Sequence, residues 1–260
     1  MLDVLNAILL GIIEGITEFL PISSTGHLLI AEHWLGQRSD TFNIVIQAGA
    51  MLAVTLVYWS RLVALATKIH LPENRLYAAK LLFAFVITAV LGLVAKKLGF
   101  KLPETISPVA WALLIGGIWI LFAEWWARKQ PNRTEVSWLV AALVGVAQVV
   151  AGIFPGTSRS GATIFAAMLG GTTDRAAATE FAFLVGIPTM YAASAVELYG
   201  QYKVGFQGEN WTLLGVAFVV STIVAFIAIK WLLGYIRSNT FTVFAYYRIA
   251  LGLILLAFFR

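Results

Sequence analysis

The sequence contains no cysteine and few charged residues. Its 18 Lys and Arg and its 13 Asp and Glu make up 12% of 260 residues, whereas a soluble domain usually carries about 25%. The absence of cysteine excludes disulfide bonds and thiol chemistry. The low and clustered charge excludes a soluble enzyme and a disordered chain.

Three long stretches have no charged residue at all. They are residues 105–123, 136–158 and 210–229. Each is about 20 residues long, which is the length at which a helix crosses a hydrocarbon layer roughly 30 Å thick. The nine Trp, eight Tyr and 17 Phe suit membrane interfaces and lipid-facing surfaces. We therefore expect an all-α polytopic membrane protein that forms a single transmembrane domain over residues 1–260.

The apolar runs differ in length and continuity. Arg248 interrupts the last of the long runs, and we expect it to pair with a carboxylate or to reach an interface. Two other regions, 2–30 and 136–170, break at Pro21 and at Pro155, and their apolar halves are too short to span. Broken helices at membrane depth are tolerated only where they line a polar cavity or are buried in protein. We expect two re-entrant hairpins and about six full transmembrane helices, over 42–59, 78–95, 106–123, 181–196, 211–229 and 240–259.

The two broken regions match each other at an offset of 134 residues. Three full spans follow each of them, so the second copy would start on the opposite side of the membrane. This predicts an inverted-topology repeat of about 1–123 and 136–260, with a binding site near the midplane at the broken segments. The matched pairs are Gly11 with Gly145, Glu14 with Gln148, Pro21 with Pro155, Ser24 with Ser158, and Thr25 with Arg159.

The net charge of +5 does not indicate a nucleic-acid partner, because the basic residues sit in short loops between apolar runs. In the predicted topology, ten Lys and Arg lie on the side opposite the N-terminus. The positive-inside rule makes that side cytoplasmic, and the first hairpin then opens to the outer face. Six lie on the side of the N-terminus, namely Arg38, Lys96, Lys97, Lys101, Lys203 and Arg260.

Glu14 and Glu18 are four residues apart and therefore share one face of a helix. Two neighbouring carboxylates at membrane depth repel each other, and a divalent cation would relieve that repulsion. Mg²⁺ and Ca²⁺ prefer oxygen ligands, and Mg²⁺ often shares its shell with substrate phosphates. We expect Glu14 and Glu18 to bind such a cation. The alternative is a pair at a helix end that is exposed to water.

The segment Ser23–His27 brings hydroxyls, free backbone N–H groups and an imidazole together just after Pro21. The start of a helix is an anion site. A Ser near a His suits nucleophilic attack with the His as base. His27 could instead attack phosphorus itself or activate a water. The alternative without catalysis is an N-cap hydroxyl with a His at the level of the lipid headgroups.

Arg159 stands in an otherwise uncharged stretch that runs from Val136 to Thr173. Its planar guanidinium suits phosphate oxygens, and the neighbouring glycines let the backbone approach a ligand closely. The alternative is an ion pair with a structural carboxylate such as Asp174. Hydroxyls that could add donors to a phosphate are those of Ser158, Ser160 and Thr163.

Two carboxylates that favour a metal, and an Arg with two helix starts that favour an anion, together indicate phosphoryl transfer to water on a lipid diphosphate. The motifs that carry these groups resemble the signatures of the undecaprenyl-diphosphate phosphatases, the bacitracin-resistance family. The first is Glu14-Gly-Ile-Thr-Glu18-Phe-Leu-Pro-Ile-Ser-Ser24-Thr-Gly-His27, and the second is Pro155-Gly-Thr-Ser158-Arg159-Ser-Gly-Ala-Thr163. The resemblance extends to the spans and to Tyr246-Tyr247-Arg248.

The resemblance implies a metal-dependent enzyme of the bacterial inner membrane that cuts undecaprenyl diphosphate to the monophosphate carrier used for peptidoglycan. Glu14 and Glu18 would be the acidic pair, with Mg²⁺ or Ca²⁺ as cofactor. We expect Ser24 to be the nucleophile, with His27 or Glu18 as base. A homodimer is left open. The residues expected to hold the diphosphate are Thr25, Ser158, Arg159, Ser160 and Thr163.

Two other functions remain alternatives. Inverted repeats with broken helices are typical of transporters, and a lipid or ion transporter would need the binding groups but not a nucleophile beside a base. The unrelated acid-phosphatase-like lipid phosphatases use a His after a Ser-Arg pair. Here Ser158-Arg159 is followed by Ser-Gly-Ala-Thr-Ile-Phe-Ala-Ala without a His, which counts against that class.

Overall fold

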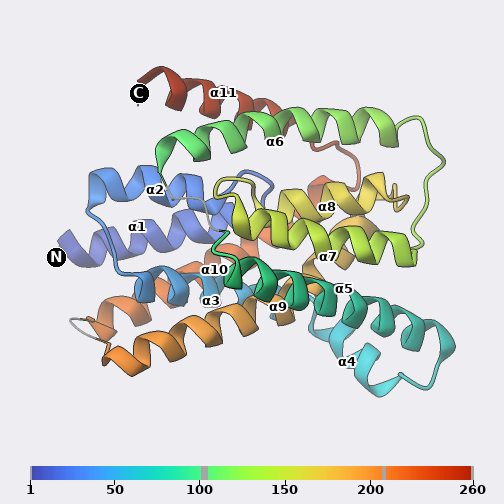
Figure 1. Cartoon of the computed structure of the whole chain (residues 1–260), viewed down its shortest axis with the longest axis horizontal. Helices are drawn as coiled ribbons and strands as arrows, with labels where there is room; N and C mark the ends of the chain where they lie inside the picture. Colours follow the sequence, from blue (N-terminus) through green and yellow to red (C-terminus); the bar gives the residue numbers. More distant parts are fainter. Residues whose placement is uncertain (1, 101–104, 207–208, 259–260) are drawn as a thin grey trace.

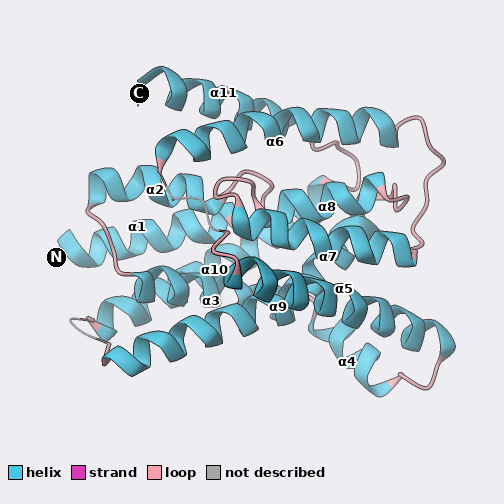
Figure 2. Ribbon diagram, in the orientation of Figure 1, coloured by secondary structure: helices cyan, strands magenta, loops and turns pink. Residues whose placement is uncertain are grey.

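The computed structural model describes residues 2–100, 105–206 and 209–258. Over these ranges the chain forms eleven helices and no strand (Figure 2). In chain order they are α1 (Leu2–Thr17), α2 (Ser24–Leu35), α3 (Asp40–Val57), α4 (Trp59–Thr67), α5 (Pro72–Lys97), α6 (Ile106–Ala127), α7 (Trp138–Ile153), α8 (Arg159–Leu169), α9 (Arg175–Val204), α10 (Trp211–Tyr235) and α11 (Thr242–Phe258).

Five helices are long and apolar enough to cross a membrane, namely α3, α5, α6, α9 and α10. They correspond to five of the six predicted spans. The sixth, 240–259, corresponds to α11, an apolar helix of 17 residues. The last residue of that predicted span, Phe259, lies outside the described part of the chain. Lys101 and Arg260, which entered the charge count, also lie outside it. The all-helical membrane fold is confirmed, and α4 is a helix that the sequence pattern did not predict.

The two broken regions form hairpins of short helices. α1 and α2 have 16 and 12 residues, and α7 and α8 have 16 and 11. At a rise of 1.5 Å per residue, even the longer ones extend only about 24 Å. In Figure 1 the α1–α2 hairpin starts at the left, the end that holds both termini, and turns back near the centre, whereas α7–α8 starts at the right. The two turns therefore meet in the middle of the molecule. An inverted repeat would produce this arrangement, and the repeat itself stays a prediction.

Close backbone contacts hold the hairpins to the long helices. α1 packs against α10, and α7 packs against α5. A Cβ on Gly11 would lie 2.8 Å from the carbonyl oxygen of Ala217, and a Cβ on Gly145 would lie 2.7 Å from that of Ala84. Only glycine permits these approaches, because any side chain would collide with backbone. Such small-residue interfaces are typical of helices that pack within a membrane.

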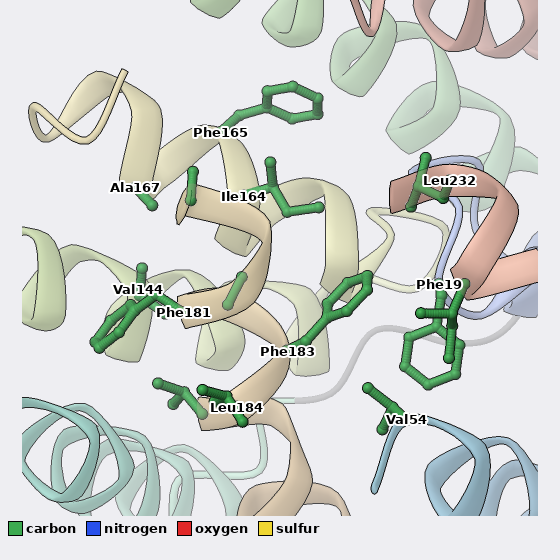
Figure 3. Packing of buried hydrophobic residues seen from close by; sticks show 14 of the residues in the cluster. Phe19, Val54, Val144, Ile164, Phe165, Ala167, Phe181, Phe183, Leu184 and Leu232 are labelled. Carbon is green, nitrogen blue, oxygen red and sulfur yellow. The ribbon is translucent and has the colours of Figure 1, made fainter. Parts of the chain in front are cut away.

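An apolar core surrounds the place where the turns meet. Figure 3 shows α9 in its centre, with Phe181, Phe183 and Leu184 projecting towards neighbouring helices. The ring of Phe183 meets that of Phe19, from the first turn, edge to face at 5.1 Å. Phe165 of α8 is likewise fully buried. The core therefore fixes the positions of both turns relative to α9.

Candidate active site

The first turn carries the two predicted carboxylates. Glu14 lies in the last turn of α1 and is 1% exposed, and Glu18 follows the end of that helix and is 8% exposed. Pro21 then prevents the helix from continuing. The alternative of a water-exposed pair is wrong, because both side chains are buried. An isolated buried carboxylate is costly unless a partner compensates its charge.

Ser23 turns the chain into α2. It has a φ of 75°, in the left-handed region that residues other than glycine seldom adopt. Its hydroxyl caps α2 by accepting a hydrogen bond from the backbone N–H of Gly26 at 3.3 Å. The cap leaves Ser24 as the first helical residue, and Thr25, half-buried, as the second. Ser24 therefore stands at the positive end of the α2 dipole.

The hydroxyl of Ser24 donates a hydrogen bond to Glu18 Oε2 at 2.5 Å, and both side chains are buried. A short bond from a hydroxyl to a carboxylate is a strong, charge-assisted one. It places the predicted nucleophile within reach of one of its two candidate bases. Of the two bases expected for Ser24, Glu18 is the one that contacts it in this structure.

His27 is turned away from Ser24. Its Nδ1 lies 2.6 Å from the carbonyl oxygen of Ser23, and its Nε2 lies 2.6 Å from the hydroxyl of Tyr247, on α11. Both ring nitrogens are therefore engaged elsewhere. Tyr247 entered the sequence analysis only as part of a resembling segment, because nothing in its spacing connects it with His27, 220 residues away.

The second turn repeats the backbone of the first. Ser158 has a φ of 67° and caps α8 by accepting from the backbone N–H of Gly161 at 3.2 Å. The caps pair Ser23 with Ser158 and Gly26 with Gly161, at an offset of 135 rather than 134. The predicted alignment is therefore wrong by one residue at the helix starts, because Pro155 is followed by one more loop residue than Pro21. The corrected alignment pairs Ser24 with Arg159.

The hydroxyls of the second turn bind backbone. Ser160 donates to the carbonyl oxygens of Glu18 and Leu20, each at 3.1 Å, and so joins the two turns. Thr163 donates to the carbonyl oxygen of Arg159 at 2.8 Å, within its own helix. Ser158 Oγ lies 3.1 Å from Ser160 Oγ. These hydroxyls therefore position the loop in this structure, and their predicted contact with a diphosphate would require some of these bonds to be exchanged.

Arg159 forms no salt bridge among the described residues, although its charge acts on that of Glu14. The alternative pairing with Asp174 is wrong, because Asp174 caps α9 and accepts from the backbone N–H of Ala177 at 2.9 Å. The half-buried guanidinium instead lines a small cavity of about 20 Å³ together with Glu18 and Gln148. A free cation beside a buried carboxylate suits the binding of a phosphate there.

The carboxylates fit a divalent cation in part. Glu14 Oε1 is buried without a hydrogen-bond partner, and so is the side-chain oxygen of Gln148, which lines the small cavity. Within the described residues no three His, Cys, Asp or Glu side chains are grouped as a metal site. A cation at Glu14 and Glu18 would therefore need further oxygens from an amide, water or phosphate. Mg²⁺ is commonly bound by one or two carboxylates together with substrate phosphates.

Arg248 fastens the two turns together. It is 1% exposed and donates to the carbonyl oxygens of Pro21 at 3.2 Å and Gly156 at 3.1 Å. It also donates to the carbonyls of Ala112 and Leu113 on α6. The expectation that Arg248 pairs with a carboxylate or reaches an interface is wrong. The backbone breaks in both hairpins leave carbonyls without helical partners, and the guanidinium satisfies two of them.

An apolar groove of about 530 Å³ leads to the turns. Its walls come from α6, α7 and α8, and its lining also includes Pro155 and Thr157 of the second turn and Arg248. Trp111 and Ile115 on α6 are exposed along it. The groove therefore opens on the apolar surface that faces lipid in a membrane protein.

Sequence comparisons identify the family of the chain. The family described as bacitracin resistance protein BacA matches residues 7–254. A protein of Rhizobium johnstonii named undecaprenyl-diphosphatase is 71% identical over 256 residues, covering 98% of this chain and 97% of that protein. Proteins of the same name from Rhizobium etli (strain CFN 42) and Xanthomonas euvesicatoria pv. vesicatoria are 70% and 61% identical, with the same coverage. With a family match over nearly its whole length, the chain belongs to the bacitracin resistance protein BacA family.

Proposed function

We propose that this protein hydrolyses undecaprenyl diphosphate to undecaprenyl phosphate and inorganic phosphate. The observation that carries the proposal is the buried Ser24 hydroxyl, 2.5 Å from Glu18, with Arg159 lining the same cavity as Glu18. The name shared by the relatives supports the same substrate. A binding protein or transporter would not need a nucleophile bonded to a buried base.

The first step forms a bond between Ser24 and the terminal phosphorus. Glu18 takes the proton of the Ser24 hydroxyl, and the oxygen attacks phosphorus. The bond from that phosphorus to the bridging oxygen breaks, and the lipid monophosphate leaves with the bonding electrons. The product on the enzyme is a phosphoserine at position 24, at the start of α2.

The second step restores the serine. Glu18, now protonated, returns its proton to the Ser24 oxygen as water attacks the phosphoserine and the serine–phosphorus bond breaks. The proton released by the water leaves with solvent or with the inorganic phosphate. Arg159 and the backbone N–H groups at the start of α8 would hold the phosphate oxygens through both steps.

Glu14 and Glu18 would hold Mg²⁺ or Ca²⁺ in this proposal. When bound, such a cation neutralises phosphate oxygens and so lowers the cost of bringing a diphosphate to two carboxylates. The unpartnered Glu14 Oε1 supports this assignment, because a buried oxygen without a hydrogen bond is otherwise costly.

The apolar groove between α6, α7 and α8 would take the first isoprene units of the lipid. Thr157 and Arg248 line it, and Arg248 bonds both turns, so a chain in the groove would lie beside them. In this proposal the headgroup is reached from the outer face of the bacterial cytoplasmic membrane. The product would return to peptidoglycan synthesis as a lipid carrier, and rapid recycling would confer bacitracin resistance.

The test is phosphate release by the purified protein in detergent from a long-chain polyprenyl diphosphate. We expect release to stop with a chelator and to return with Mg²⁺ or Ca²⁺. Release that ignores the chelator would remove the metal from the proposal and leave the serine chemistry. No release under any metal, from protein whose helicity is intact, would refute the phosphatase and favour the lipid or ion transporter.

A further inference from the structure

Tyr247 and His27 form a bonded pair across the molecule. His27 Nε2 and the Tyr247 hydroxyl are 2.6 Å apart, and the two rings stack with centroids 5.6 Å apart and planes 8° from parallel. His27 belongs to α2 and Tyr247 to α11, so the pair joins the start of the first hairpin's second helix to the last helix. Two contacts of this kind fix both the position and the plane of the imidazole.

The bonding partners determine which ring nitrogen carries the proton. A backbone carbonyl can only accept, so Nδ1 must donate to the carbonyl oxygen of Ser23. In the neutral ring Nε2 then has the lone pair and accepts from the Tyr247 hydroxyl. In this tautomer Nε2, the one nitrogen that could take a proton, is already engaged, and neither nitrogen contacts Ser24.

The chain of bonds ends at a strained residue. It runs from the Tyr247 hydroxyl through His27 to the carbonyl of Ser23, whose φ of 75° is strained in a residue other than glycine. Ser24 is the next residue, and its hydroxyl direction depends on the Ser23 backbone. A conformation of this kind persists only where the surroundings hold it.

We propose that Tyr247 is a positioning residue that holds His27 in the Nδ1–H tautomer, and that His27 serves as a brace for Ser23 and not as the base for Ser24. The proposal rests on the proposed function, in which Ser24 is the nucleophile. It assigns proton transfer to Glu18 alone, and His27 only holds the backbone of Ser23 in place.

The tautomer can be read without any activity measurement. The sequence has three histidines, so replacing His33 and His70 by Gln leaves the His27 ring alone in a ¹⁵N spectrum of histidine-labelled protein. We expect one protonated and one unprotonated nitrogen, and a shift of the unprotonated signal in Tyr247→Phe. Tyr246→Phe is the matched control, because Tyr246 is exposed on the same helix and should leave the spectrum unchanged. An unchanged spectrum in Tyr247→Phe would overturn the pairing.

Turnover then separates a brace from a base. The side-chain amide of Asn reaches the place of Nδ1, whereas that of Gln reaches the place of Nε2. The backbone N–H of residue 27 donates to the Ser23 carbonyl at 3.3 Å in either variant. We expect His27→Asn to keep most of kcat and His27→Gln to lose more, since of the two side chains only that of Asn can replace the bond from Nδ1. His27→Asn as inactive as Ser24→Ala, in protein that remains folded, would show that His27 is the base and overturn the proposal.

Tyr247→Phe should lower kcat by about 2- to 10-fold with little change in KM, which is the net worth of one neutral hydrogen bond. Because Tyr247 acts through His27, the same change in a His27→Asn background should have no further effect. Additive losses would overturn the relay from Tyr247 to His27. Wild-type protein that releases no phosphate would refute the phosphatase, while the ¹⁵N spectrum would still decide the pairing.

Discussion

The two hairpins have the same backbone conformation at their turns but carry different polar side chains. Ser23 and Ser158 have φ values of 75° and 67°, and each caps the helix that follows it. Yet the first helical residue is Ser24 in α2 and Arg159 in α8. The same turn thus presents the proposed nucleophile in one hairpin and the proposed phosphate-binding cation in the other.

The acidic groups are divided in the same way. The first hairpin has Glu14 and Glu18, where the second has Gln148 and Gly152 at the 134-residue offset that still holds in the first helices. Gln148 donates to Thr88 and Thr189 at 3.2 and 3.4 Å and so serves as a neutral structural side chain. The second hairpin therefore has no carboxylate at these positions to offset the charge of Arg159.

Ser24→Ala should produce the largest difference between the hairpins. Removing the nucleophile should lower kcat on the order of 10⁴-fold, because no covalent route remains. Phosphate release measures the fall in kcat. Radiolabelling of the protein by a substrate labelled at the terminal phosphate measures the loss of the phosphoserine. The control is Ser39→Ala, a cap of α3 whose loss should cost about 1 kcal/mol of stability and leave turnover unchanged. A rate retained within tenfold in Ser24→Ala would favour attack by a metal-bound water.

Arg159→Ala should remove the contribution of the second hairpin to phosphate binding. We expect kcat/KM to fall about 10²- to 10³-fold, with KM raised and kcat lowered, since the guanidinium would contact phosphate in both ground and transition states. Arg159→Lys keeps the charge but not the planar fork, so its kcat/KM should lie between those of the wild type and Arg159→Ala. Arg128→Ala, at the exposed end of α6, is the control for loss of one Arg. Unchanged kinetics would place Arg159 outside the site.

Glu14 and Gln148 occupy matched positions in the two hairpins, and exchanging them tests whether a carboxylate is needed at the first position. Glu14→Gln makes the first hairpin resemble the second, and should raise the Mg²⁺ concentration for half-maximal activity by about 10- to 100-fold. Gln148→Glu in the same protein tests whether a carboxylate near the small cavity can substitute for it. Metal titrations of the single and double variants measure this. An unchanged metal requirement in Glu14→Gln would leave Glu18 as the sole protein ligand.

The helical membrane fold and both helix breaks could be predicted from the sequence. An uncharged run and a Pro within an apolar segment each act on the local backbone, so neither depends on knowing the tertiary structure. The sequence also named Glu18 as one of two candidate bases for Ser24, and the structure shows a hydrogen bond between these two side chains, while the role of base stays a prediction. It did not predict that Arg248 binds carbonyls of both turns, since the choice between a carboxylate and a carbonyl depends on which backbone groups lie nearby. The offset of 135 at the caps was missed because the loop between Pro155 and Ser158 has one residue more than the loop between Pro21 and Ser23. Only the capping hydrogen bonds show which Ser of each motif begins its helix.

The apolar groove should have the smallest effect, and it distinguishes the lipid tail from the headgroup. Ala166 of α8 lines the groove, and Ala166→Trp would fill part of its volume of about 530 Å³. We expect KM for a long-chain diphosphate to rise about tenfold, since buried apolar contact is worth roughly 0.8 kcal/mol per CH₂ and only part of it is lost. A diphosphate on a methyl or ethyl group, which has no isoprene unit to place in the groove, should be hydrolysed as before, because its headgroup contacts are unchanged. Ala142→Trp on α7, outside the groove, controls for a bulky side chain. Equal losses with both substrates would mean that the change acts on the turns themselves and that the tail lies elsewhere.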